Sequence, residues 1–160
     1  MNRVRTTAAV LLLAGLSVGA AHAADEHNTV PGLTAAGAPL GLHGFDPVSF
    51  IEIGNRTEGK AQYAAVHDNV AYYFSSEANR RAFEKSPARY TPQFGGFCTF
   101  GVSVAKKFDG DPRYAAVENG KLYVFLNEDI FNEFQKDRAG TIAKAERNWR
   151  RIEHEAAASL

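Results

Sequence analysis

The chain contains a single cysteine, Cys98, within the stretch FGGFCTFGV at residues 94–102. A thiolate is a strong nucleophile and a good ligand for zinc and copper ions. One cysteine cannot form a disulfide within its own chain, so Cys98 is buried, paired between chains, a metal ligand or a reactive group. His43 and Asp46, in the stretch GLHGFDP, could act with it, because a thiolate, an imidazole and a carboxylate together suit zinc or copper.

The elements that would position these residues come from an internal repeat. Residues 58–83 align without a gap on residues 109–134, and nine of the 26 aligned pairs are identical. Each copy has two aromatic, strand-like runs around a turn, followed by a capped helical pattern. The repeat predicts two pseudo-symmetric hairpin-then-helix units, packed as one small α+β domain over residues 41–156.

An amphipathic helix is predicted after the second unit. Ile142, Ala145, Trp149 and Ile152 recur at spacings of three and four residues. Charges of alternating sign occupy the rest of this segment, which indicates a solvated outer face.

The repeat also predicts where Cys98 lies. Gly44-Phe45-Asp46 aligns with Gly96-Phe97-Cys98 when the offset is 52 residues. Asp46 precedes Pro47 and reads as a helix cap, so Cys98 is expected to begin a helix over about residues 99–106. Free amides there would lower the thiol pKa below about 8.5, and we expect the sulfur to be partly accessible from a pocket.

The ends of the chain indicate export. Residues 1–23 have a basic start, an apolar run and the small-x-small close Ala21-His22-Ala23, a pattern typical of a secretory signal peptide. Residues 24–40 lack periodicity and are expected to form a flexible lead-in. His27 in this lead-in, His67 at a hairpin turn and His154 in the last helix read as surface residues. The expected location is secreted or periplasmic, with no membrane span once the signal is removed.

Composition excludes some functions. The 18 basic and 18 acidic residues balance, which gives no basic surface for nucleic acid. No hydrolytic Ser-His-Asp pattern and no nucleotide-binding pattern stands out, so whether the chain is an enzyme stays open.

The stretches HGFDPVSF, YYFSSEANRRAFEKSPARY and GGFC resemble the YHS domain family, over about residues 41–149. The resemblance implies metal binding, with copper favoured. Members of the family that are linked to metals have cysteines at three positions of the domain. Those positions here are Ser49, Ser75 and Asn79, whose hydroxyl and amide groups bind copper and zinc poorly. Cys98 matches the position where exported members carry a thiol or a selenol.

Three hypotheses remain open. The first is a soft-metal binding protein, for copper or zinc, with Cys98, His43 and Asp46 as ligands and a metal-handling partner. The second is a thiol-redox protein that uses Cys98 without metal and needs a thiol partner. The third is a structural or interaction module in which Cys98 is buried.

The signal pattern yields the first testable prediction. Cleavage after Ala23 should leave an exported chain of 137 residues that begins at or near Ala24. N-terminal sequencing of the exported protein checks it, and retention of Met1 would refute it.

Overall fold

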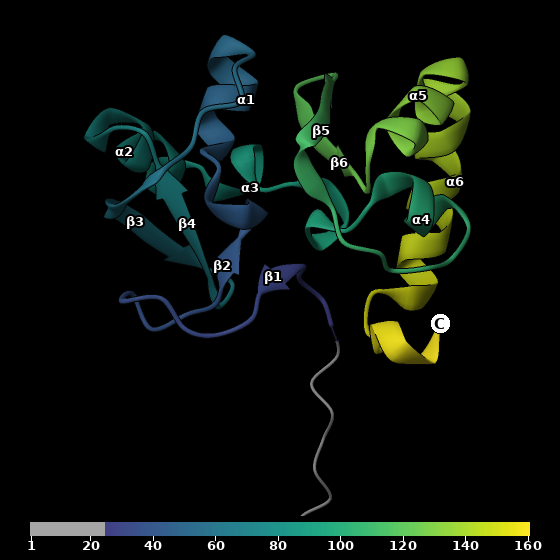
Figure 1. The fold of residues 1–160 in the computed structure, drawn as a ribbon, viewed down its shortest axis with the longest axis horizontal. Helices are drawn as coiled ribbons and strands as arrows, with labels where there is room; N and C mark the ends of the chain where they lie inside the picture. Colours follow the sequence, from purple (N-terminus) through teal and green to yellow (C-terminus); the bar gives the residue numbers. More distant parts are fainter. Residues whose placement is uncertain (1–24) are drawn as a thin grey trace, which may run out of the picture.

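The computed structural model describes residues 25–160, and these form a small α+β fold of two units that lie side by side (Figure 1). The elements of the first unit, in chain order, are β1 (Thr29–Val30), β2 (Leu40–Gly41), η1 (Leu42–Gly44), α1 (Pro47–Ile53), β3 (Lys60–His67), β4 (Val70–Phe74), α2 (Glu77–Lys85) and α3 (Pro87–Tyr90). Those of the second are η2 (Gln93–Gly96), α4 (Thr99–Ser103), β5 (Asp111–Glu118), β6 (Lys121–Phe125), α5 (Glu128–Lys136), α6 (Arg138–Ile152) and η3 (Ala157–Ser159). The predicted fold class is therefore confirmed. The predicted signal peptide lies outside the described residues, in which no helix is both long and apolar enough to cross a membrane.

The two units repeat each other in element order, bounds and strand register. β5, β6 and α5 each begin and end 51 residues after β3, β4 and α2. Both hairpins also have the same irregularity, between Lys60 and Ala64 in β3 and between Asp111 and Ala115 in β5. The superposition of Tyr63 on Tyr114 and of Phe83 on Phe134 stays a prediction.

Local sequence explains where the helices begin. The side chain of Asp46 caps α1, Pro47 occupies its first turn, and Gly54 ends it in the left-handed region with φ of 71°. Ser76 caps α2 and Asn127 caps α5, each through its side-chain oxygen. The helix predicted after Cys98 is shorter than expected, because it ends at Ser103 and Ala105 takes a positive φ of 58°.

One strand is shared by the two hydrophobic cores. In β6, Leu122 and Val124 pack in the first core, whereas Tyr123 and Phe125 pack in the second. A strand points successive side chains to opposite faces, so β6 is buried on both. The two units are thereby packed into one domain.

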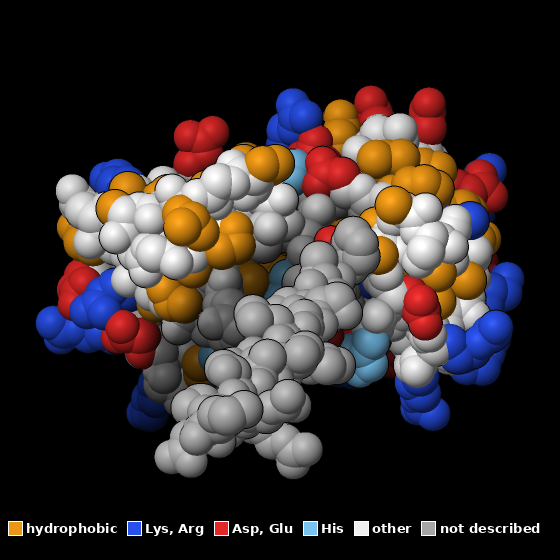
Figure 2. Space-filling view, turned by 90° about the horizontal axis from the view of Figure 1, so that it is seen from below, with side chains coloured by type: hydrophobic (Ala, Val, Ile, Leu, Met, Phe, Trp, Pro, Cys, Tyr) orange, Lys and Arg blue, Asp and Glu red, His pale blue; other side chains and the backbone are white. Residues whose placement is uncertain are grey.

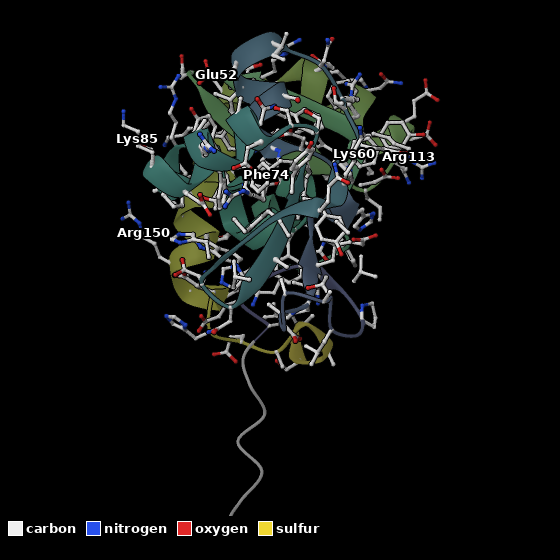
Figure 3. The ribbon with its side chains drawn as sticks, turned by 90° about the vertical axis from the view of Figure 1, so that its left-hand side faces the viewer. Glu52, Lys60, Phe74, Lys85, Arg113 and Arg150 are labelled. Carbon is white, nitrogen blue, oxygen red and sulfur yellow. The ribbon has the colours of Figure 1, made fainter. Side chains whose placement is uncertain are left out.

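The first core is centred on Phe74, which is fully buried at the end of β4. Figure 3 shows Phe74 inside the first unit, while Glu52, Lys60 and Lys85 point outward. The ring of Phe83 from α2 lies 5.0 Å from that of Phe74, centroid to centroid. This aromatic contact holds the helix against its hairpin.

Residues 25–30, which we call the strap, contact both units, while the flexibility expected of residues 24–40 stays a prediction. β1 pairs with β2, which in turn pairs with β4 of the first unit. The backbone N–H of Asn28 donates to the carbonyl of Gly95 at 2.8 Å, and its side chain donates to Asp109 at 2.7 Å. Gly95 and Asp109 are distant from Asn28 in the sequence, so no local periodicity could predict these contacts.

Substitution of Gly95 tests the packing of the strap. Gly95 has φ of 61°, and a Cβ there would overlap the carbonyl oxygen of Glu26. Gly120 has φ of 74° with nothing within 4 Å, so it is a matched control. Both alanine variants should lose about 1 kcal/mol from backbone strain, and Gly95→Ala should lose roughly 2 kcal/mol more from overlap. Urea unfolding measures both, and equal losses would contradict the described packing.

Candidate functional site

Asp46 is the centre of a buried polar network in the first unit. Its side chain is fully buried, and its Oδ1 accepts hydrogen bonds from the backbone amides of Val48 at 2.9 Å and Ser49 at 3.2 Å. Its Oδ2 accepts from the amide of Ser75 at 2.8 Å, the hydroxyl of Ser75 at 2.6 Å and the side-chain amide of Asn79 at 2.6 Å. A buried carboxylate with this many donors is stable without a cation.

The three positions that the YHS resemblance singled out meet at this carboxylate. The hydroxyl of Ser49 donates to Asp46 Oδ2 at 3.1 Å. The amide of Asn79 also donates to the hydroxyls of Ser49 at 3.3 Å and Ser75 at 3.2 Å. Residues separated by up to 30 positions therefore converge on one point, where hydroxyls and an amide form hydrogen bonds with one another.

Cys98 caps α4, as the repeat predicted. Its sulfur accepts a hydrogen bond from the backbone amide of Gly101 at 3.4 Å. It is also fully buried, among Phe97, Val102 and Phe125 of the second core.

The prediction of an accessible thiol with a lowered pKa is wrong. Burial raises the pKa of the Cys98 thiol above its ordinary value, and the charge of Asp109 adds to this rise. Backbone hydrogen bonds lower it, but the desolvation is the larger effect. The position of Cys98 at the start of a helix could be predicted from the sequence, but the apolar side chains that surround its sulfur could not.

The surroundings of Asp46 and Cys98 correspond through the repeat. The amides that hold Asp46 belong to Val48, Ser49 and Ser75, and their counterparts 52 or 51 residues later are Phe100, Gly101 and Leu126. Of these three counterparts, the amide of Gly101 donates to the Cys98 sulfur at 3.4 Å, and the backbones of Phe100 and Leu126 also act to lower the pKa of the thiol. The side chains differ, because Gly101, Leu126 and Ile130 stand where the first unit has Ser49, Ser75 and Asn79. One backbone arrangement thus holds a carboxylate in one unit and a thiol in the other.

An apolar cavity of about 130 Å³ adjoins the Cys98 thiol. The residues that line it are Cys98, Phe100, Gly101, Val104, Phe108, Leu126 and Ile130. Three of them are large hydrophobic residues that remain exposed, with exposed fractions of 56% for Val104, 47% for Phe108 and 37% for Leu126. The cavity therefore has a hydrophobic rim at the protein surface.

His43 lies apart from this cavity and joins the two units. Its backbone is left-handed, with φ of 47°, and its Nε2 lies 2.9 Å from Oδ1 of Asp109. The strap residue Asn28 donates to the same carboxylate oxygen. His43 thus connects the two units through Asp109, a residue that the sequence analysis did not identify.

The predicted ligand set of Cys98, His43 and Asp46 is therefore not assembled. Each of the three side chains has a different set of partners. Among residues 25–160, no group of three or more His, Cys, Asp and Glu side chains is placed to hold a metal ion. The repeat places Asp46 and Cys98 at corresponding positions in two different units. Corresponding positions need not be close in space, so the repeat was no evidence that the two side chains meet.

Sequence reasoning also missed Lys107, which is only 6% exposed. Its ammonium donates to the main-chain carbonyls of Asp25, Glu153 and Glu155. It also lies 5.3 Å from the ring centroids of both Phe97 and Trp149. Burial lowers the pKa of Lys107. A lysine in the run KKFD gives no sequence signal for this role.

Comparisons of the chain with protein-family models, with curated proteins and with solved structures found no match.

The Asp46 network gives a prediction for stability. Asp46→Ala should lower the free energy of unfolding by roughly 3 kcal/mol, because several buried donors lose their acceptor. Asp137→Ala is the matched control, since Asp137 caps α6 through one exposed bond to the amide of Gly140 at 2.9 Å. This control should lose only about 1 kcal/mol. Chemical unfolding measures both, and a loss at Asp46 no larger than at Asp137 would refute the structural role.

Proposed function

We propose that this chain is an exported, YHS-like interaction module, and that its Cys98 cavity receives an apolar side chain of a partner protein. The observation that carries the proposal is the fully buried thiol beside an apolar cavity with an exposed hydrophobic rim. A cavity of about 130 Å³ suits a group the size of a leucine or phenyl side chain. The signal pattern of residues 1–23 supports export, and the resemblance described above supports the assignment as a YHS-like domain.

The surroundings of Cys98 favour this function over metal binding. A metal ligand must be a thiolate, and burial among apolar side chains disfavours that form. A copper or zinc ion also needs more than one protein ligand, and the other residues that line the cavity carry only apolar side chains or none. The hydroxyls and the amide at the three family positions further support a domain that is stable without metal.

One observation favours the thiol-redox alternative. The backbone groups of Phe100, Gly101 and Leu126 lower the pKa of the Cys98 thiol, and they would also stabilise an oxidised, anionic sulfur. The barrier to this chemistry is access, because no part of Cys98 is exposed. Reactivity of the native thiol therefore decides between the two functions.

Alkylation of native Cys98 tests the proposal. The thiol should react with iodoacetamide at least about 100-fold more slowly in the native protein than in urea, because it is buried and protonated. In the control Cys98→Ser/Val104→Cys, the thiol moves to the exposed rim of the same cavity and should react at an ordinary rate. Rapid alkylation of native Cys98, or zinc or copper binding that Cys98→Ser abolishes, would overturn the proposal.

The cavity itself is tested with benzene as a stand-in for an apolar side chain. Benzene should bind the native protein and shift amide resonances around Cys98 in NMR spectra. Val104→Asp should weaken binding roughly 10-fold because it places a charge on the rim. Val66→Asp is the matched control, since Val66 is similarly exposed, at 49%, but does not line the cavity. A cavity that takes up no benzene would contradict the proposal.

A further inference from the structure

Two histidines from distant parts of the chain line one small cavity. His27 belongs to the strap and His67 ends β3, and both border a cavity of about 80 Å³. The remaining lining residues are Asp68, Tyr72, Thr91, Pro92 and Gly95. Two imidazoles and a carboxylate at one cavity are side chains that bind divalent transition metals. None of these residues belongs to the Cys98 site.

The ring of His67 is held in a defined orientation. Its Nε2 lies 3.2 Å from Oδ2 of Asp68, and its plane meets the ring of Phe83 edge-on, at 84° and 6.1 Å between centroids. Histidine ligands commonly bond a carboxylate through the nitrogen that does not bind the metal. Asp68 would play that part here and would leave Nδ1 of His67 for an ion.

Gly95 allows His27 to approach the same cavity. A Cβ at Gly95 would lie 3.3 Å from the Cα of His27, closer than ordinary packing distance. The strap is fixed next to this point by the bond from the Asn28 amide to the Gly95 carbonyl. His27 is therefore positioned by backbone contacts, although it stands in a segment without sequence periodicity.

A wider cleft of about 700 Å³ adjoins the small cavity and shares His27, Asp68 and Gly95 with it. Four carboxylate residues line this cleft, namely Asp25, Glu26, Asp68 and Glu153. They outnumber the ammonium of Lys107, which donates to the carbonyls of Asp25 and Glu153. Figure 2 views the molecule from this end and shows acidic and histidine side chains where the two units meet. The resulting negative potential would attract cations to the imidazoles.

We propose that His27 and His67 together bind one divalent zinc or copper ion. The described residues offer no ready group of three ligands, so the protein supplies two imidazoles and water completes the coordination. A cavity of about 80 Å³ has room for an ion with about two water molecules. The carboxylates of the cleft compensate the charge of the ion.

Calorimetric titration of the exported protein with Zn²⁺ and, separately, with Cu²⁺ tests this site. We expect one ion per chain, with affinity roughly 10-fold or more weaker in His27→Gln and in His67→Gln. His43→Gln and Cys98→Ser are the matched controls and should bind as the native protein does. The two titrations show which ion the site prefers, and thermal unfolding confirms that each variant is folded.

A second measurement does not depend on the variants. The electron paramagnetic resonance spectrum of the native protein with one equivalent of Cu²⁺ should show nitrogen couplings from two imidazoles. Absence of saturable binding of either ion, or binding unchanged in both histidine variants, would overturn the inference and leave the Cys98 proposal intact. Loss of binding in Cys98→Ser would overturn both.

Discussion

The alternation of side chains along β6 is the constraint on which the rest of the structure depends. Leu122 and Val124 pack with the first core, which also contains Val48 of α1. Tyr123 packs with the second core, which contains Cys98 at the start of α4. A shift of one residue in the strand register would exchange the two faces. The starts of α1 and α4 therefore both depend on the register of β6, which cannot shift without exposing one of the two cores.

The duplicated architecture separates what the backbone does from what the side chains do. In both units the chain turns into a short helix so that amides face one capping atom, an oxygen of Asp46 or the sulfur of Cys98. In the first unit, three polar side chains complete the site, and the carboxylate is stabilised although it is buried. In the second unit, apolar side chains replace them and favour the neutral thiol. The side chains around each cap, more than the cap itself, determine its chemistry.

Much of the fold could be predicted because the signals are local or repeat. The hairpin turn at Asn119-Gly120 and the caps at Ser76 and Asn127 depend on contacts between near neighbours, and the 51-residue offset reveals the repeat of such local signals. The related offset of 52 residues, which aligns Asp46 with Cys98, correctly placed Cys98 at the start of a helix. The raised pKa of Cys98 could not be predicted in this way, because burial is its largest cause and residues of the surrounding core, such as Phe125 and Phe134, lie far from Cys98 in the sequence.

The strap shows the same limit more strongly. Residues 25–30 have no periodic pattern, yet Asn28 bonds to Gly95 and Asp109, and the carbonyl of Asp25 accepts from Lys107. Each bond joins residues separated by more than 60 positions, and nothing in the local sequence marks Gly95, Asp109 or Lys107 as a partner. Such contacts follow from the packed tertiary structure, which brings distant segments together.

Burial would also protect the thiol in the oxidising compartment that the proposed export implies. Thiol oxidation and disulfide exchange proceed through the thiolate and require access to the sulfur. Desolvation raises the pKa of Cys98, and no part of the side chain is exposed, so both requirements fail in the native state. A serine there could still accept from the amide of Gly101, but it would place a polar hydroxyl against Phe97 and Phe125, whereas sulfur tolerates an apolar environment. A buried cysteine therefore suits the capping position of α4 better than the carboxylate that caps α1, because the second unit lacks the polar side chains that a carboxylate needs.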